Sequence, residues 1–485
     1  MPRTESGSED PRSIDVPRLF GTDGIRGRAG TYPLDPATVR RVGAALVRAL
    51  PRGVPNEAAA WGAPPGTEST ESPRLLIGRD TRESGEWIEA ELAHGADGEG
   101  ARVMSAGIVP TPAIAYLTRT AGYDAGVVIS ASHNPFEDNG IKVFSGRGEK
   151  FTERVEREVE AIVADSSWRA SGGQAGAVAR ANLVSAYLDH LRAVFPEALT
   201  LTGGAGPFGP AGFKLGIDCA NGATTTVAPA LLGGLGFETV VIGNRPDGRN
   251  INLRCGSTHP EALTRTVVER GLQMGVAFDG DGDRAIFVDH RGAVVNGDAV
   301  LLMCADQLQR EGRLKGGAIV ATVMSNIGLE LALRSRGIDL VRCAVGDKYV
   351  MEEMLARGLS LGGEQSGHVI FSDYLFTGDG LCTALNVLRV VALTGRTLAD
   401  LAGDLTAYPQ VLVNVRVREK ADLKNVPQVD AVVSRVESRL SGHGRLLVRY
   451  SGTEPLLRVM LEGTDEHEIR AWAQEIVDVV KEHLG

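Results

Sequence analysis

The 485-residue sequence lacks the features of several classes of protein. It has five cysteines, an odd number without a Cys-x-x-Cys pair, so neither a disulfide framework nor a cysteine zinc site is expected. No apolar run approaches the roughly 20 residues that span a membrane. The N-terminal stretch MPRTESGSEDPRSIDVPR has no apolar core of the kind found in signal peptides. These absences predict a cytoplasmic protein without a membrane partner.

Basic residues are outnumbered, and lysine is scarce. Lys and Arg total 51 against 61 Asp and Glu, a net charge of −10, and only eight of the 51 are lysine. A chain of this balance does not offer the broad basic surface that nucleic acid requires, so no nucleic-acid partner is expected. Hydrophobic residues at 43% and charged residues at 23% are ordinary for a soluble globular protein.

The chain is long enough for three or four domains, at roughly 100–200 residues each. Short apolar stretches alternate with helical stretches from residue 75 onward, which predicts α/β sheets. This rhythm occurs three times, and the end of the chain has a different, α+β pattern. We therefore predict an α/β fold with three related mixed α/β domains and a small C-terminal α+β domain. The expected divisions are a disordered tail at 1–14 and domains at 15–180, 181–291, 292–405 and 406–485.

Three segments rich in Pro, Gly and polar residues interrupt this pattern. Residues 51–73 and 165–176 are predicted to be surface insertions, and residues 202–212 a loop or hinge.

The strongest chemical signal is the segment DGDGDR. Asp279, Asp281 and Asp283 alternate with glycine between two apolar strands, so their carboxylates can converge on one hard cation such as Mg²⁺. A calcium loop of the EF-hand type is disfavoured, because Arg284 and His290 stand where that loop needs Gly and Glu. The alternative is a set of solvated charges.

Two further segments suit phosphate chemistry. FGTDGIRG, residues 20–27, can turn backbone N–H groups and Arg26 toward an anion, or can be an ordinary tight turn. ISASHNP, residues 129–135, follows a strand that looks buried, and its position fits an exposed hydroxyl in an α/β crevice. It can equally be a polar turn.

Two glycine-bounded segments suit recognition of a substrate. GGEQSGH, residues 362–368, combines Glu364, Ser366 and His368, a mixture that suits binding of sugar hydroxyls, although such a histidine is more often structural. RYSGTEPLLR, residues 449–458, has the composition of a phosphate clamp, or of a hairpin with exposed arginines.

Taken together and in this order, these five segments resemble the signatures of the α-D-phosphohexomutase superfamily along nearly the whole chain. LFGTDGIRG, INLRCGSTHP (residues 251–260) and GGEQSGH are most similar to its bacterial phosphoglucosamine mutase branch. The resemblance implies four domains around a central cleft, the last one a mobile lid. It implies interconversion of glucosamine 6-phosphate and glucosamine 1-phosphate through a phosphoserine enzyme and a bisphosphate, which supplies UDP-N-acetylglucosamine and cell-wall synthesis.

The resemblance also implies a role for each matching residue. Ser132 is the phosphorylated nucleophile and a metal ligand, and Asp279, Asp281 and Asp283 hold Mg²⁺ with it. Lys142, Arg26 and Arg284 lie near the reacting phosphoryl group. The implied substrate-binding residues are Glu364, Ser366, His368, Arg449, Ser451, Gly452, Thr453 and Arg458. Lys348 departs from the family, which has arginine there, and its contact stays undetermined.

Several alternatives stay open at this stage. A sugar-phosphate-binding protein would keep the clamp without needing Ser132, and a metal-dependent phosphatase would keep the aspartates and admit water. Within the superfamily, a phosphomannomutase/phosphoglucomutase is the alternative. The sequence leaves open the oligomeric state, for which a homodimer is one option, and the general acid or base.

Overall fold

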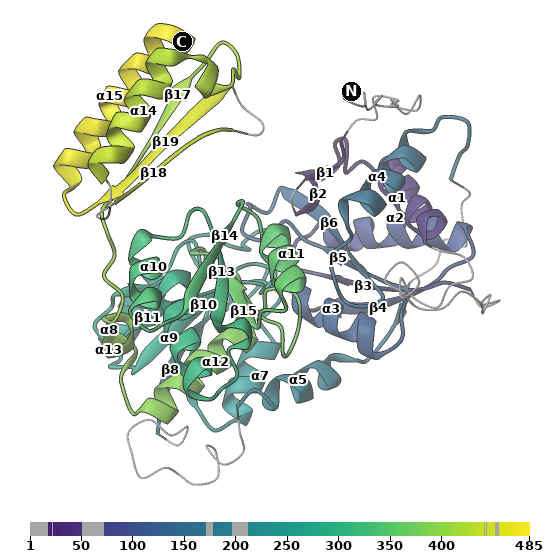
Figure 1. Cartoon of the computed structure of the whole chain (residues 1–485). Coiled ribbons are helices and arrows are strands. Elements are labelled where there is room, and N and C mark those ends of the chain that lie inside the picture. The colour runs from purple at the N-terminus through teal and green to yellow at the C-terminus, as the bar shows by residue number, and fades with distance from the viewer. Residues whose placement is uncertain are drawn as a thin grey trace.

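The computed structural model describes residues 18–21, 23–50, 72–170, 178–195, 212–440, 442, 444–451 and 455–485. Within this part of the chain the strands form four sheets that follow one another in sequence (Figure 1). The fold is therefore α/β with several domains, as predicted. The tail at 1–14 and all or part of the segments at 51–73, 165–176 and 202–212 lie outside the described residues.

The first unit (residues 18–180) has a seven-stranded mixed sheet. Its strand order is β1 (Phe20–Gly21), β2 (Gly24–Arg28), β6 (Asp138–Ser145), β5 (Ala125–Ile129), β3 (Arg74–Arg79), β4 (Arg102–Ile108) and β7 (Ala179–Arg180). The run AGVVI in β5 is buried at every residue, as expected for a strand covered on both faces. The helices are α1 (Pro36–Ala49), α2 (Gly85–Gly98), α3 (Thr111–Thr120) and α4 (Glu153–Ala164).

The second unit (residues 184–295) has a five-stranded sheet. Its order is β12 (Val294–Val295), β11 (Ala285–Asp289), β10 (Met274–Phe278), β8 (Lys214–Asp218) and β9 (Glu238–Ile242). The helices are α5 (Val184–Arg192), α7 (Val227–Gly234) and α8 (Glu261–Glu269). β10 and β11 pair antiparallel, so the acidic segment between them is the loop of a hairpin.

The third unit (residues 297–402) has a four-stranded sheet. Its order is β14 (Asp339–Cys343), β13 (Ala318–Thr322), β15 (Leu361–Gly363) and β16 (Val369–Phe371). The helices are α9 (Gly297–Arg310), α10 (Ile327–Arg334), α11 (Asp347–Arg357), α12 (Gly380–Thr394) and α13 (Leu398–Ala402), with a 3₁₀ turn, η2, at Lys315–Gly317.

The fourth unit (residues 410–485) has a three-stranded antiparallel sheet. Its order is β17 (Gln410–Arg416), β19 (Leu456–Gly463) and β18 (Gly444–Tyr450), with η3 (Leu423–Asn425), α14 (Pro427–Leu440) and α15 (Glu466–Leu484). Both long helices cover one face of the sheet (Figure 1). This unit has its own apolar core, whereas one continuous core connects the first three units. Figure 1 shows the fourth unit set apart from the others.

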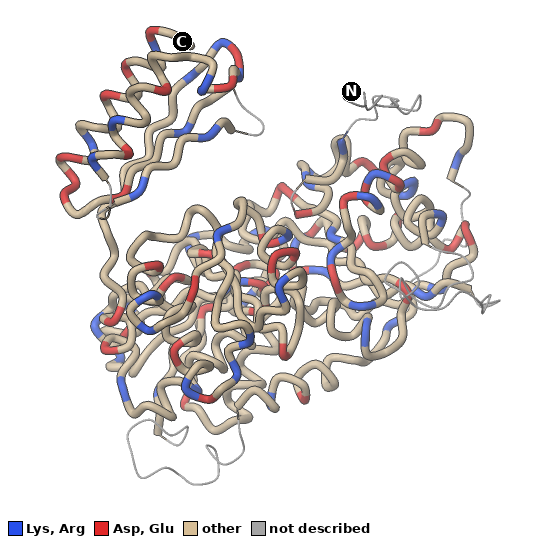
Figure 2. Tube along the Cα trace, in the orientation of Figure 1, with Lys and Arg blue, Asp and Glu red and all other residues tan. Residues whose placement is uncertain are grey.

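The described chain carries charges of both signs in all four units, interspersed with each other (Figure 2). Among the described helices, none combines the length and the apolar character needed to cross a membrane. All five cysteines are described, buried and unpaired.

Candidate active site and metal centre

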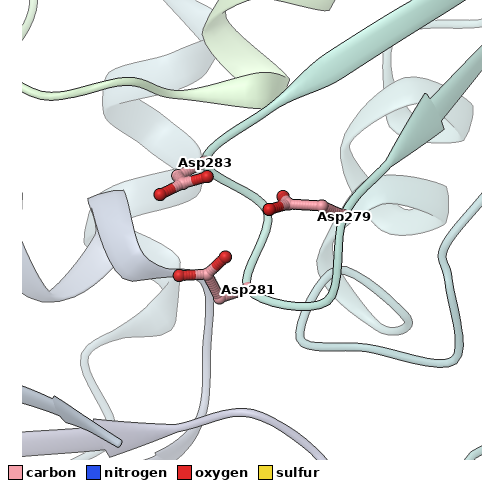
Figure 3. A group of neighbouring side chains, drawn as sticks. All are labelled: Asp279, Asp281 and Asp283. Atoms are coloured by element: carbon pink, nitrogen blue, oxygen red, sulfur yellow. The ribbon is translucent and has the colours of Figure 1, made fainter. Parts of the chain in front are cut away.

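Three aspartates converge in the loop between β10 and β11 (Figure 3). Carboxylate oxygens of Asp279, Asp281 and Asp283 lie within 4.8 Å of one another, and all three residues are buried. The intervening Gly280 permits this packing, because a Cβ there would lie 2.5 Å from the Ser132 carbonyl oxygen. The loop is thereby pressed against the segment that follows β5.

The donor set fits a hard cation. The Oδ1 atoms of Asp281 and Asp283 are buried and have no hydrogen-bond partner in the described part of the chain. Burial, together with the carboxylates of Asp283 and Asp281, raises the pKa of Asp279 well above its usual range. Oxygen donors with excess negative charge favour a divalent ion. The triad can therefore bind a metal.

Ser132 lies directly beside this triad. Its Oγ donates a 2.5 Å hydrogen bond to Asp279 Oδ2, and the residue is fully buried. Its backbone has a φ of 54°, in the left-handed region that non-glycine residues rarely adopt. Such a conformation persists only where the surroundings impose it.

Two residues that sequence reasoning missed impose this conformation. The buried Arg82 guanidinium donates to the carbonyl oxygens of Ser132 (2.9 Å), Asn134 (2.9 Å), Pro135 and Asp138 (2.9 Å). Asn252 Nδ2 adds a 2.8 Å hydrogen bond to the same Ser132 oxygen. The Arg82 side chain thus holds the backbone of residues 132–138, which we call the serine loop.

A second chain of contacts fixes the other side of Ser132. Asp80 pairs with Arg82 at 2.8 Å and accepts a 2.6 Å hydrogen bond from Ser130 Oγ. Ser130 Oγ in turn accepts the Ser132 N–H at 2.9 Å. The available sequence signal is the segment GRDTR, residues 78–82, which begins in the last two residues of the buried strand β3 beside β5.

Lys142 brings positive charge into the carboxylate cluster. It lies on β6, next to β5, and its Nζ is 2.8 Å from Asp281, 3.1 Å from Asp283 and 3.1 Å from Asp23. Burial opposes the charged ammonium, but these three carboxylates raise the pKa of Lys142 well above its usual range. Arg26, on β2, forms an ion pair with Asp23.

Arg284 also reaches the serine segment. Its side chain lies 2.5 Å from His133 Nδ1, and its backbone N–H donates to Asp279 Oδ1 at 3.1 Å. Burial and the charges of Arg284 and Arg26 lower the pKa of His133 to about 4, so this imidazole is a neutral acceptor. The Nε of Arg284 is buried without a hydrogen-bond partner in the described residues and is free to donate to an anion.

The residues expected to recognise the sugar lie on the turn between β15 and β16. Glu364 accepts from the Gly346 N–H at 3.3 Å and from Ser366 Oγ at 3.4 Å. His368 differs from these two: it is buried, with Nδ1 3.7 Å from Asp283 Oδ2 and Nε2 accepting the Gly378 N–H. The structure therefore places His368 against residues 279–283 between β10 and β11, which we call the metal loop.

A cavity of about 1,020 Å³ separates the first unit from the third. Its lining includes Asp23, Arg26, His133, Arg284 and Glu364. Arg26 and Arg284, predicted to lie near the phosphoryl group, thus line the same cavity as Glu364, which is predicted to bind the sugar.

The expected phosphate clamp belongs to the fourth unit. Arg449 on β18 and Arg458 on β19 are directly paired in the sheet, and Ser451 follows β18. Burial and the charge of Arg458 lower the pKa of Arg449, because a nearby like charge disfavours the protonated guanidinium. Gly452 and Thr453 lie outside the described residues. Strands β18 and β19, which carry these arginines, lie apart from β10 and β11 (Figure 1).

Known proteins resemble the chain over nearly its full length. The phosphoglucosamine mutase of Solibacter usitatus is 47% identical over 475 residues, covering 96% of this chain and 99% of the relative. That of Syntrophotalea carbinolica is 45% identical over 472 residues, with 96% and 98% covered. A crystal structure of a phosphoglucomutase/phosphomannomutase family protein from Burkholderia thailandensis has a TM-score of 0.74 at 25% identity and covers 96% of this chain and 97% of its own.

Four family models match successive parts of the sequence. They describe phosphoglucomutase/phosphomannomutase α/β/α domain I at residues 17–170, domain II at 185–292, domain III at 296–408 and the C-terminal domain at 412–479. The chain belongs to the phosphoglucomutase/phosphomannomutase family.

Proposed function

We propose that this chain interconverts glucosamine 6-phosphate and glucosamine 1-phosphate. The family establishes a sugar-phosphate mutase, and full-length relatives named phosphoglucosamine mutase support the amino sugar as substrate. One observation supports this chemistry most directly: the Ser132 hydroxyl stands 2.5 Å from a carboxylate of the buried triad.

We propose Ser132 as the phosphorylated nucleophile. In the first half-reaction the bond between phosphorus and Ser132 Oγ breaks, the phosphoryl group joins the free hydroxyl oxygen of the sugar, and the proton of that hydroxyl passes to Ser132 Oγ, which gives a bisphosphate. In the second half-reaction the bond between the other phosphorus of the turned bisphosphate and its sugar oxygen breaks, the phosphoryl group joins Ser132 Oγ, and the serine proton passes to the sugar oxygen. Asp279, Asp281 and Asp283, with an oxygen of the phosphoserine, would hold Mg²⁺. When bound, the ion neutralises charge on the transferring group.

The remaining side chains neutralise and position the reactants. Lys142 balances two of the carboxylates, and Arg284 offers its unpaired Nε to a phosphoryl oxygen. We assign Arg26, which lines the same cavity, to the reacting phosphate. Phosphoryl transfer depends mainly on such placement and charge compensation.

We propose that the third and fourth units hold the rest of the substrate. Glu364 and Ser366 would accept from and donate to sugar hydroxyls. We assign His368 a supporting role beside them, since it is buried behind the turn. Arg449, Ser451, Gly452, Thr453 and Arg458 would grip the phosphate that is not reacting. Residues 406–485 would act as a lid that closes on the cavity and excludes water.

A coupled assay of the purified protein on glucosamine, glucose and mannose 6-phosphates tests this proposal. We expect the highest kcat/KM with glucosamine 6-phosphate. Equal or faster turnover of mannose 6-phosphate would instead indicate a phosphomannomutase/phosphoglucomutase. Release of inorganic phosphate without isomerisation would indicate a phosphatase.

A further inference from the structure

The start of helix α11 makes two ion pairs of opposite polarity with the first unit. Asp347, its first residue, pairs with Lys150 of the segment after β6. Its neighbour Lys348 pairs with Glu156 of α4, with 2.7 Å between Nζ and Oε2. Asp347 and Lys348 thus carry opposite charges, and each of them contacts a residue of opposite charge in the first unit.

All four side chains are largely shielded from solvent. Between 10% and 14% of each side chain is exposed. Charges in such places interact more strongly than surface pairs, and truncation of Lys348 removes the close cationic partner of Glu156. The alternation of sign also favours one placement of the start of α11, because an exchange of partners would set Asp347 against Glu156 and Lys348 against Lys150.

The pairs connect directly to both sides of the site. Lys150 also bonds Asp23 at 2.6 Å, and Asp23 contacts Lys142 beside the metal loop. On the other side, the Gly346 N–H, one residue before Asp347, donates to Glu364. The start of α11 is therefore one point at which the Glu364 turn is tied to the first unit.

We propose that Asp347 and Lys348 form a two-way ion-pair latch that fixes Glu364 relative to the serine and metal loops. In this assignment Lys348 is a positioning residue that acts through Glu156, and it does not contact the sugar phosphate. The Lys348 ammonium already has one close carboxylate partner, Glu156. Unlike a guanidinium, an ammonium cannot form a bidentate pair of hydrogen bonds with phosphate. The functional consequence rests on the proposed function, whereas the latch itself does not.

Charge exchange across the pair tests the assignment. The variants are Lys348→Glu, Glu156→Lys and the double exchange, with Lys348→Arg as the conservative variant. We expect each single reversal to raise the KM for glucosamine 6-phosphate roughly tenfold, the effect that a typical coupling between contacting residues gives. The double exchange should recover most of the loss, and Lys348→Arg should behave like the wild type.

The matched control is an ion pair inside the third unit. Lys315 and Asp373 are 2.7 Å apart and more exposed, so Lys315→Glu should leave KM unchanged. A substrate contact predicts a different pattern: Lys348→Glu would be impaired, Glu156→Lys would be nearly normal, and the double exchange would recover nothing. That pattern would overturn the proposal.

Hydrogen exchange supplies a readout that needs no substrate. In the latch, each single reversal increases amide exchange at the start of α11 and in α4 together, and the double exchange restores protection. Unchanged exchange in both helices would overturn the latch even if the enzyme is active. If the wild type does not convert glucosamine 6-phosphate, the proposed function fails, and the exchange data still decide the latch.

Discussion

Ser132 and its neighbour Ser130 have distinct parts in the site. Ser132 directs its hydroxyl at the Asp279 carboxylate, whereas Ser130 directs its hydroxyl at Asp80 and accepts the Ser132 N–H. Ser130 lies two residues before Ser132, so Ser130→Ala would be a natural control for a Ser132 variant. The structure shows that it is a poor one, because its hydroxyl holds the backbone of Ser132.

Ser132→Ala should remove nearly all mutase activity, by about 10⁴-fold or more, because a missing nucleophile is not replaced by its neighbours. The coupled assay and thermal unfolding should be measured together. A matched control is Ser145→Ala, a buried serine on β6 of the same sheet. A folded Ser132→Ala protein with near-normal turnover would reject the assignment.

Removal of divalent metal should abolish activity, and added Mg²⁺ should restore it. The reason is that Lys142 balances the three buried carboxylates only in part, and two of their oxygens have no hydrogen-bond partner among the described residues, so a divalent ion can take them as ligands. Metal content and turnover should be followed through treatment with a chelator and re-addition. Asp281→Asn should weaken metal binding, and the exposed Asp189→Asn should not. Full activity in protein shown to be metal-free would contradict the prediction.

At the scale of elements, the serine loop is held by a side chain that follows the neighbouring strand, β3. Arg82 follows β3, and its guanidinium collects four carbonyl oxygens of residues 132–138. The glycine at position 280 lets the metal hairpin approach this loop. The catalytic geometry therefore depends on packing between β3, β5 and the β10–β11 hairpin.

Arg82→Lys should lower kcat by roughly 10²-fold, because a lysine cannot satisfy four carbonyl oxygens and misplaced reactants lose this much rate. KM should change little, since the substrate-binding side chains lie elsewhere. Arg82→Ala should also reduce the free energy of unfolding by about 3–5 kcal/mol, because Asp80 is left buried and unpaired. Steady-state kinetics and denaturant unfolding measure the two effects.

The control for this prediction is Arg74→Lys, at the exposed start of the same strand. It should leave both kcat and stability near the wild-type values. A normal kcat in a folded Arg82→Lys protein would show that the loop keeps its conformation without the guanidinium.

At the scale of the whole molecule, the first three units share a core and the fourth does not. A fully buried Glu462 ties the fourth unit to the third through the Ile327 N–H at 3.2 Å and Asn326 Nδ2 at 3.3 Å. A unit with its own core and few polar ties to its neighbour is suited to move as a rigid body.

Arg449→Ala should weaken 1-phosphate and 6-phosphate substrates alike, by about 2–5 kcal/mol where the ion pair with phosphate is desolvated. In the proposed function these residues grip whichever phosphate is not reacting, so both directions should depend on Arg449. Metal affinity should stay unchanged, because the triad belongs to another unit. Kinetics in both directions and metal titration test this, with the exposed Arg435→Ala as control. Loss in one direction only would show that the clamp lies elsewhere.

Local sequence was sufficient for most elements and for the metal loop. The buried strand that precedes ISASHNP, the alternation of short strands and helices from residue 75 onward, and the different pattern of the C-terminal unit all follow from apolar spacing. The triad could be predicted because its three aspartates are neighbours in sequence. Lys142 was named through family resemblance alone, and its three carboxylate contacts come from pairing of β6 with β5.

Only the tertiary structure revealed the groups that act across long separations in sequence. Arg82 holds carbonyl oxygens about 50 residues away, and Lys348 pairs with Glu156 at a separation of 192. No periodicity records such contacts, because the first depends on the pairing of β3 with β5 and the second on how the first unit meets the third. The sequence by itself determined the elements and the chemistry of each loop, and the packing of the units decided which loops meet.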